Sequence, residues 1–379
     1  MQYRPIGKTG KKAGIIGLGC EHLDRKPYEQ VRETIHTALD HGVNYLDIFM
    51  PGREIREDIA KALGDRRRDV YIQAAIGSTD INQQYDISRD LPTVKKYFEE
   101  ALRLYGYIDF GMLFFIDTEE DFAKVFDGGI ADYALKLKEM GDIHHIGFSS
   151  HKPDIARKVV ETGLAEVMMF SINLAFDLVP TGSDVFEAMD KRWEGYELSS
   201  LDPERAELYA LCEQTGVGIS VMKTLGAGKL ISPEHTPFSR PMTVNQCVHY
   251  ALSRPAVFSV LLGCQTGSEV KDALTYLKAD EADKDFTPFL SELEGNFTGK
   301  CVYCSHCQPC PEEIDIAMVN KYLDIALLDQ QRVPETIRLH YHSLAKGADA
   351  CTACGSCESR CPFEVPIIEN MEKAAALLG

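Results

Sequence analysis

The sequence predicts an α/β protein in which a (β/α)8 TIM barrel is followed by a small, cysteine-rich helical domain. Eight short apolar segments alternate with helix-length amphipathic segments up to about residue 280. Near-continuous apolar strands separated by helices are typical of a parallel sheet covered by helices. The composition then changes, because eight of the twelve cysteines fall between residues 301 and 361. We therefore expect a barrel at 1–285 and a second domain at 286–379.

The eight expected strands are rich in β-branched and aromatic residues. Three of the intervening segments, "YEQVRETIHTALDHG", "LPTVKKYFEEALRLYG" and "PERAELYALCEQTG", have helical periodicity and end in Gly, as helix C-termini often do. The expected strands cover 14–20, 45–49, 70–76, 110–116, 143–150, 167–173, 218–224 and 258–263.

The formal charge of −18 and the pI near 5.1 argue against binding to nucleic acid or to an anionic membrane surface. The basic run Arg66 to Arg68 is short, and we interpret it as a solvated loop. The N-terminus lacks an apolar segment of signal-peptide length, so we expect a cytoplasmic protein. Cytosolic thiols stay reduced, and a dense cysteine pattern there favours metal binding over disulfides.

In a (β/α)8 barrel the chemistry lies at the C-terminal ends of the strands. Polar or ionisable residues occur at each of these ends and are candidates by position. They are Cys20, Glu21, His22, Asp47, Ser78, Tyr85, Arg89, Asp117, Ser149, Ser150, His151, Asn173, Lys223, Cys264 and Gln265.

Two cysteine motifs, "CVYCSHCQPCP" and "CTACGSCESRCP", carry the clearest chemical signal. Three cysteines spaced by two residues bind one [4Fe–4S] cluster, and the fourth, which precedes Pro, binds the other cluster in two-cluster ferredoxins. A structural zinc site needs only four ligands and does not explain this pattern. The expected ligand sets are Cys301, Cys304, Cys307 and Cys361 for one cluster, and Cys351, Cys354, Cys357 and Cys310 for the other. The segment between the motifs reads as helical, which resembles helical ferredoxin modules.

The barrel segments "YRPIGKTGKKAGIIGLG", "HGVNYLDIF", "GDIHHIGFSSH" and "VMKTLGAGKL", followed by the cysteine motifs, resemble the aldo/keto reductase family. More closely, they resemble its branch with a C-terminal 4Fe–4S ferredoxin domain. The resemblance implies carbonyl reduction with NADPH by a Tyr acid, supported by Lys, Asp and His. Asp47 matches the Asp, but the positions of the Tyr, Lys and His hold Gly52, Ala75 and Phe114. Three of the four catalytic positions are therefore lost, and Ala or Gly cannot move a proton.

The resemblance also implies a nicotinamide-binding pair at Ser149 and Ser150. The loop "LGCQTGSEVKD" lacks the Arg and Lys that hold a 2′-phosphate, so NADH is at least as suitable as NADPH. The turn "TLGAGKL" and the helix after the eighth strand occupy positions where barrels bind phosphate, whether of NAD, a flavin or a substrate. The cofactor-binding candidates are Ser149, Ser150, Asn173, Lys223, Gly226, Gly228 and Gln265.

We expect an iron–sulfur oxidoreductase in which two clusters exchange electrons between an external redox protein, such as a ferredoxin, and a cofactor or small-molecule substrate at the barrel mouth. One alternative is an NAD(P)H-dependent carbonyl reductase with a rearranged acid. Another is a non-catalytic barrel that serves as an electron-transfer partner. Asp47, Tyr85 and His151 are the catalytic candidates, since a phenol or an imidazole is the simplest substitute proton donor.

Overall fold

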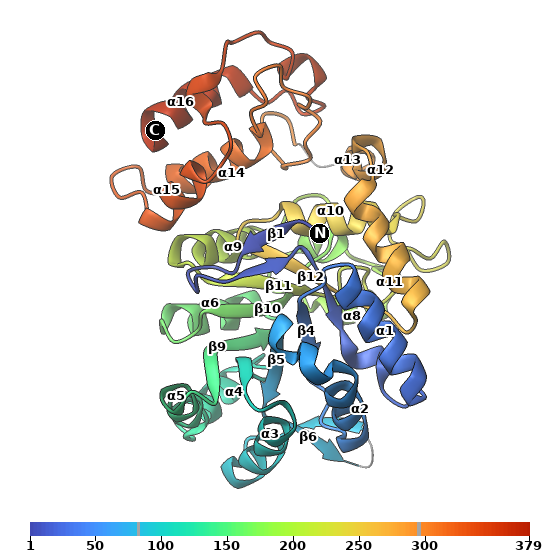
Figure 1. Ribbon diagram of the computed structural model, residues 1–379. Helices are drawn as coiled ribbons and strands as arrows, with labels where there is room; N and C mark the ends of the chain where they lie inside the picture. The colour runs from blue at the N-terminus through green and yellow to red at the C-terminus, as the bar shows by residue number, and fades with distance from the viewer. Residues whose placement is uncertain (82–83, 294–296) are drawn as a thin grey trace. The chain divides into compact units, whose positions relative to one another are not determined.

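The computed structural model describes residues 1–81, 84–293 and 297–379 (Figure 1). The chain divides into two compact units, and each is described by itself. The first unit contains residues 1–172, 217–224 and 257–278, and the second contains 173–216, 225–256 and 279–379. The predicted boundary near residue 285 stays a prediction.

Eight parallel strands of the first unit close into a barrel, as the sequence predicts. Each strand hydrogen-bonds to the next in chain order, and the last returns to the first. The strands are β3 (Ile16–Gly19), β4 (Tyr45–Ile48), β5 (Tyr71–Ile76), β8 (Ile108–Leu113), β9 (Ile143–Ser150), β10 (Val167–Ser171), β11 (Gly218–Met222) and β12 (Val257–Gly263).

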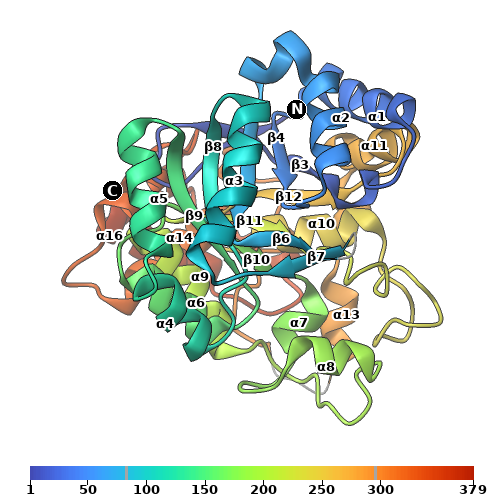
Figure 2. The same cartoon turned by 90° about the horizontal axis from the view of Figure 1, so that it is seen from below.

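Helices of the same unit lie outside the strands (Figure 2). Their buried faces follow helical periodicity; in α1, for example, Val31, Ile35, Ala38 and Leu39 are buried. The helices of this unit are α1 (Tyr28–Asp40), α2 (Arg53–Leu63), α3 (Leu91–Tyr105), α4 (Glu119–Phe126), α5 (Ile130–Met140), α6 (Pro153–Glu161) and α11 (Gly267–Ala273). Two short antiparallel strands, β6 (Ser78–Ile81) and β7 (Gln84–Ile87), follow β5.

The N-terminal end of the barrel is closed by a hairpin of β1 (Tyr3–Pro5) and β2 (Lys12–Gly14) and by an aromatic cluster. The Tyr45 ring contacts the rings of Phe110 and Phe258 with centroids 5.5 and 5.1 Å away. Gly218 lies so near the segment after β1 that a Cβ there would meet the Gly7 nitrogen at 2.8 Å. The site must therefore lie at the opposite end, where the strands terminate.

Our interpretation of the basic run as solvated is wrong for Arg67. Its side chain is 13% exposed, and its Nη2 donates to Asp109 Oδ2 at 3.0 Å. The guanidinium also lies 4.1 Å from the centroid of the Tyr107 ring. Asp109 is a buried carboxylate on β8 and therefore requires a cation, which the run supplies.

The second unit is helical, and two of its helices, α14 and α15, lie between the cysteine motifs as the sequence predicts. Asn320 of α14 accepts a hydrogen bond from Asn370 of α16 at 2.7 Å, which joins the two sides of this module. Its helices are α7 (Leu174–Leu178), α8 (Val185–Asp190), α9 (Pro203–Thr215), α10 (Val244–Ser253), α12 (Glu281–Lys284), α13 (Thr287–Ser291), α14 (Ile316–Leu328), α15 (Glu335–His342) and α16 (Ile367–Leu378).

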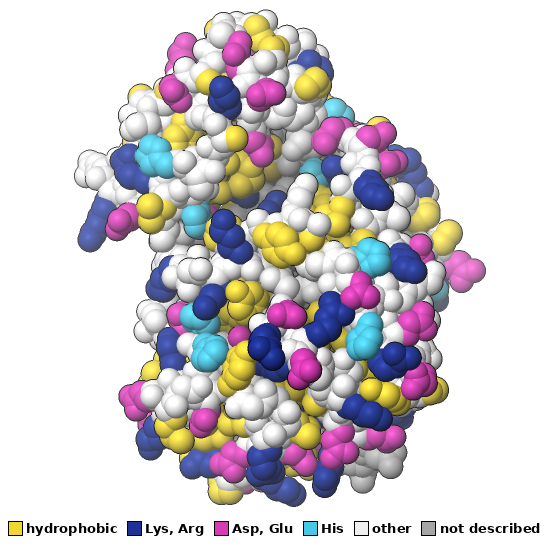
Figure 3. Space-filling model, viewed as in Figure 1, with side chains coloured by type: hydrophobic (Ala, Val, Ile, Leu, Met, Phe, Trp, Pro, Cys, Tyr) yellow, Lys and Arg dark blue, Asp and Glu magenta, His cyan; other side chains and the backbone are white. Residues whose placement is uncertain are grey.

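Within the described ranges, no helix is both long and apolar enough to span a bilayer. On the face of the molecule in Figure 3, acidic and basic side chains are interspersed.

Candidate functional site

Asp47 lies at the C-terminal end of β4 with its side chain held inside the barrel. Gln73 Nε2, from the neighbouring strand β5, donates to Asp47 Oδ1 at 2.9 Å. The amide oxygen of Gln73 accepts from the hydroxyls of Tyr45 at 2.9 Å and Ser220 at 3.2 Å. Because the two hydroxyls fix the orientation of the amide, its NH2 group is directed at the carboxyl group.

Burial raises the pKa of Asp47 from 3.8 to about 7, and the nearby Glu21 carboxylate contributes to the increase. The hydrogen bond from Gln73 opposes this shift but is the smaller effect. A carboxyl group that titrates near neutral pH is suited to proton transfer. The family resemblance implies four catalytic positions, which we call the tetrad. Asp47 is the only one of these four residues whose side chain can act as an acid or a base.

Three aromatic side chains form a wall at the same end of the barrel. Phe49 stacks on Phe114 with ring centroids 5.8 Å apart, and Tyr85 lies edge-on to both rings at 5.2 and 6.3 Å. Glu21, in the turn after β3, raises the pKa of Tyr85 as well as that of Asp47, although burial is the larger cause in both. An acidic neighbour makes the phenol a weaker acid, whereas the Lys expected in the family would have the opposite effect.

His151 lies at the end of β9 and is paired with Asp117. Its Nδ1 lies 2.8 Å from Asp117 Oδ2, and its main-chain nitrogen donates to Asp117 Oδ1 at 2.7 Å. Burial opposes ionisation of Asp117, but the hydrogen bonds from His151 and Ser150 outweigh it and lower the pKa of Asp117. The imidazole is 4% exposed and contacts the Phe115 ring, which in turn contacts Phe114 of the aromatic wall.

The remaining tetrad positions carry no acid–base group. Gly52 precedes the first turn of α2, Ala75 is buried in β5, and Phe114 belongs to the aromatic wall. Two thiols near the strand ends, Cys20 and Cys264, are buried, and burial raises the pKa of both, so they stay protonated. The assignment of these three residues to the family's Tyr, Lys and His positions stays a prediction.

The predicted nicotinamide pair is engaged within the protein. Ser149 Oγ accepts from the Phe115 nitrogen at 2.8 Å, and Ser150 Oγ donates to Asp117 at 3.1 Å. The Gln265 carbonyl accepts from the side chains of Gln30 and Thr34, and the Gln265 nitrogen donates to Glu269. The cofactor roles assigned to these residues stay predictions.

Other cofactor candidates are placed by local backbone structure. Asn173 caps α7 by accepting from the Phe176 nitrogen at 2.9 Å. Lys223, Gly226 and Gly228 all have positive φ angles of 57 to 85°, which shape the turn after β11. Their predicted cofactor contacts also stay predictions.

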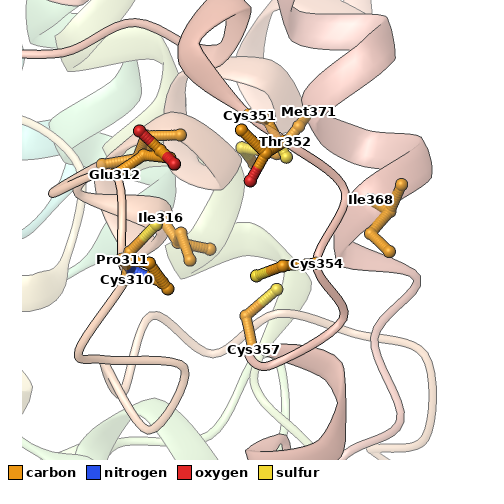
Figure 4. A pocket seen from close by; sticks show the side chains of 11 residues that line it. Cys310, Pro311, Glu312, Ile316, Cys351, Thr352, Cys354, Cys357, Ile368 and Met371 are labelled. Carbon is orange, nitrogen blue, oxygen red and sulfur yellow. The ribbon is translucent and has the colours of Figure 1, made fainter.

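The cysteine motifs of the second unit surround two separate pockets. One is lined by Cys301, Cys304, Cys307 and Cys361 and has a volume of about 310 Å³, which includes space open to solvent. The other is lined by Cys310, Cys351, Cys354 and Cys357 and has a volume of about 360 Å³, which also includes space open to solvent. Figure 4 shows Cys310 on one side of the second pocket and the other three cysteines on the opposite side. Ile316 lines both pockets and separates the two sets.

No group of three or more His, Cys, Asp or Glu side chains that could hold a single metal ion occurs in the part of the chain that the structure describes. A [4Fe–4S] cluster binds each of its four cysteines through a different iron, which requires sulfurs farther apart than the ligands of one ion. Burial raises the pKa of the Cys304 and Cys307 thiols to about 11 and 12. Metal binding at these positions would therefore release protons.

The fold and the barrel site define a (β/α)8 enzyme with an acid–base carboxyl group at the C-terminal ends of its strands. The aldo/keto reductase family matches residues 15–243, which is more than half of the chain. The chain belongs to the aldo/keto reductase family, and it is an oxidoreductase of this type.

Solved structures show the same fold. The holo form of the aldo-keto reductase AKR11C1 from Bacillus halodurans is 18% identical, with a TM-score of 0.58, and the match covers 77% of this chain and 96% of that one. An aldo-keto reductase-like protein from Pseudomonas aeruginosa is 15% identical, with a TM-score of 0.54, over 72% of this chain and 94% of that one. At these identities the likeness establishes the fold alone.

Gln73 is the site residue that sequence reasoning missed. It is the only polar residue in the strand segment "VYIQAAI". A buried amide must find hydrogen-bond partners, so a polar residue inside an apolar strand indicates a network in the barrel interior. That signal was present in the sequence, although it did not identify Asp47 as the partner.

Proposed function

We propose that the protein is a nicotinamide-dependent carbonyl reductase in which Asp47 replaces the missing Tyr as proton donor. The observation that carries this proposal is the buried Asp47 carboxyl group, whose pKa is raised to about 7. An acid whose pKa lies near the working pH is both protonated and able to give up its proton. The family assignment supports hydride chemistry over the electron-conduit function that we expected first, and over a non-catalytic barrel.

Reduction of a carbonyl to an alcohol requires one hydride, which carries both electrons, and one proton. Reduced nicotinamide supplies a hydride to the carbonyl carbon when it is bound, and is oxidised in doing so. Asp47 donates its proton to the carbonyl oxygen, which completes the alcohol. Gln73 holds the carboxyl group in place through the 2.9 Å hydrogen bond and stabilises the carboxylate that remains. Since a buried carboxylate is costly, Asp47 then recovers a proton from solvent.

The residues at the barrel mouth fit a flat, uncharged ring. Phe49, Phe114 and Tyr85 present an apolar wall on which a nicotinamide or an aromatic substrate can lie. Ser150 must give up its hydrogen bond to Asp117 before its hydroxyl can donate to a carboxamide, whereas the Ser149 hydroxyl accepts from the Phe115 nitrogen and keeps its proton for a ligand. The aromatic wall and the Ser149 hydroxyl are therefore the features that support a nicotinamide site.

The test is reduction of a panel of aldehydes and ketones with NADH and NADPH by the full chain. We expect Asp47→Asn to lower kcat by at least about 100-fold, as the loss of a general acid does. The wild-type rate should fall as the pH rises above about 7, because Asp47 then loses its proton. Tyr85→Phe is the matched control and should keep most of the activity. Full activity in Asp47→Asn, or its loss in Tyr85→Phe, would contradict this assignment.

A second candidate function rests on the two sets of cysteines. We propose that the second unit includes a ferredoxin-type domain in which Cys301, Cys304, Cys307 and Cys361 hold one [4Fe–4S] cluster, and Cys351, Cys354, Cys357 and Cys310 the other. The grouping of the eight residues around two pockets supports these ligand sets, each with three cysteines from one motif and one from the other. Such clusters would exchange single electrons with an external redox protein in a reducing, cytoplasmic setting.

Anaerobic reconstitution tests the clusters directly. We expect about eight irons and eight sulfides per chain, with a visible spectrum that a low-potential reductant bleaches. Cys310→Ser and Cys361→Ser should each perturb a different cluster, although both lie in the last position of their motifs. Thermal melting of both variants distinguishes loss of a ligand from loss of the fold. A total near one or two irons would indicate a mononuclear site and overturn the two-cluster proposal.

A further inference from the structure

A cavity formed entirely by residues of the second unit lies beside the first cysteine set. It has a volume of about 780 Å³, which includes space open to solvent. Residues of α9, of the turn at 254–255, of the first cysteine motif and of α14 form its walls.

Arg254 lines this cavity as a buried cation, and the described residues provide it with no anionic partner. Arg254 is 4% exposed. Nη2 donates to Ser253 Oγ at 2.9 Å and to the Val302 carbonyl, and the guanidinium lies 5.2 Å from the centroid of the Tyr303 ring. No ion pair involves Arg254 within residues 1–81, 84–293 and 297–379. A buried charge in this position needs an anion from elsewhere.

Asp324, on α14, presents the opposite charge to the same cavity. Its Oδ2 accepts from the Tyr303 hydroxyl at 2.8 Å, and no cation lies within ion-pair distance among the described residues. The ring of Tyr303 thus lies between an unpaired guanidinium at its face and an unpaired carboxylate at its hydroxyl. The cavity therefore offers a ligand one cationic group and one anionic group, both next to Tyr303.

The other charged groups of the cavity are compensated within the protein. Asp177 accepts from Arg205 Nε and from the hydroxyls of Tyr209 and Tyr250, each at 2.7 Å. Asp202 caps α9 and accepts from the Glu204 nitrogen at 3.0 Å. Glu207 is exposed at the rim. Arg254 and Asp324 are therefore the two charges left to a ligand.

We propose that this cavity binds a small zwitterion of the α-amino acid type with an apolar side chain. The ligand's carboxylate pairs with Arg254, and its ammonium group pairs with Asp324. Charge-assisted hydrogen bonds of this kind give both affinity and orientation. The apolar side chain packs on Tyr303, Pro255, Ile325 and Leu328, which line the cavity beside the two charges. The site is separate from Asp47 and does not depend on the proposed function.

Titration calorimetry of the full chain at a pH above 7 tests the proposal with matched probes. L-phenylalanine carries both charges, phenethylamine lacks the carboxylate, and 3-phenylpropionate lacks the ammonium group. We expect saturable binding of L-phenylalanine or L-leucine, and an affinity at least about tenfold lower for each probe that lacks one charge, since a hydrogen bond to a charged group is worth roughly 1.5–3 kcal/mol. Absence of saturable binding for both amino acids would overturn the proposal. Single-charge probes that bind as tightly as L-phenylalanine would overturn it as well.

Variants locate the binding. Arg254→Gln and Asp324→Asn should each weaken L-phenylalanine binding by about tenfold or more. Ala206 is an exposed residue of α9 that lines the cavity. Ala206→Trp should fill the cavity and leave the charges of Arg254 and Asp324 in place. Arg240→Gln removes a cation whose side chain is 55% exposed and should leave the affinity unchanged. Binding that survives Ala206→Trp, in a variant with an unchanged melting temperature, would place the ligand elsewhere and refute the assignment.

Discussion

Asp47→Asn is expected to stabilise the protein at neutral and alkaline pH while it removes the proposed proton donor. Burial raises the pKa of Asp47 from 3.8 to about 7, whereas the unfolded chain titrates near its ordinary value. The difference of about 3 pKa units corresponds to an upper limit of about 4 kcal/mol, at 1.36 kcal/mol per unit. The Asn amide oxygen can still accept the hydrogen bond from Gln73.

The pH dependence gives the sign of the effect. Below about pH 4 the carboxyl group is protonated in both states, so Asp47 carries no charge penalty. Between about pH 4 and 7 the folded state holds a proton that the unfolded state has lost, and stability falls as the pH rises. Above about pH 7 the penalty is complete and constant. The advantage of Asp47→Asn should therefore grow with pH and level off above 7.

Calorimetric melting of wild type and variant across this pH range measures the difference. A gain of about 2 kcal/mol would raise the melting temperature of the barrel transition by roughly 4–8 °C. Asp117→Asn is the control of opposite sign, because His151 lowers the pKa of Asp117 and the carboxylate is stabilising at neutral pH. A melting difference for Asp47→Asn that is independent of pH, or a net loss at pH above 7, would refute the reasoning.

Two further predictions concern the stability of the barrel. Arg67→Ala should lower the free energy of unfolding by about 3–5 kcal/mol, because it leaves Asp109 charged and buried, whereas Arg66→Ala should change it by at most about 0.5 kcal/mol. Denaturant unfolding measures both, and equal losses would show that burial of the ion pair is unimportant. Gly218→Ala should cost about 1–3 kcal/mol, since its Cβ would meet main-chain nitrogen at 2.8 Å, and Gly19→Ala, with no atom nearer than 3.9 Å, should be nearly neutral. Similar melting temperatures for the two glycine variants would contradict the close approach.

The barrel could be predicted because its signals are local. Each strand is a short run such as "YLDIF" or "VMMFSIN", and the order of strands and helices along the chain restricts the topology to very few arrangements. The helices α14 and α15 could also be predicted from the local sequence, because apolar residues recur in it with helical periodicity. The buried ion pair of Arg67 could not be predicted, because its partner Asp109 lies on β8, which is distant in sequence, and composition alone favours a solvated run.

Spacing within each cysteine motif predicts which thiols share a site, and these ligand sets stay a prediction. One pocket is lined by Cys361 and the first three cysteines of the first motif, and the other by Cys310 and the first three cysteines of the second motif.

The sequence by itself determined the fold class and the loss of Tyr, Lys and His at the tetrad positions, because both depend on which residue stands at which place in the chain. Only the tertiary structure decided which of the remaining groups can act as an acid. Asp47 acquires a pKa of about 7 because burial and Glu21, at the end of the preceding strand, raise it by more than the hydrogen bond from Gln73, on the next strand, lowers it. A pKa depends on the solvation and charges around a group, and these are contributed by segments that are distant in sequence and meet only when the barrel closes.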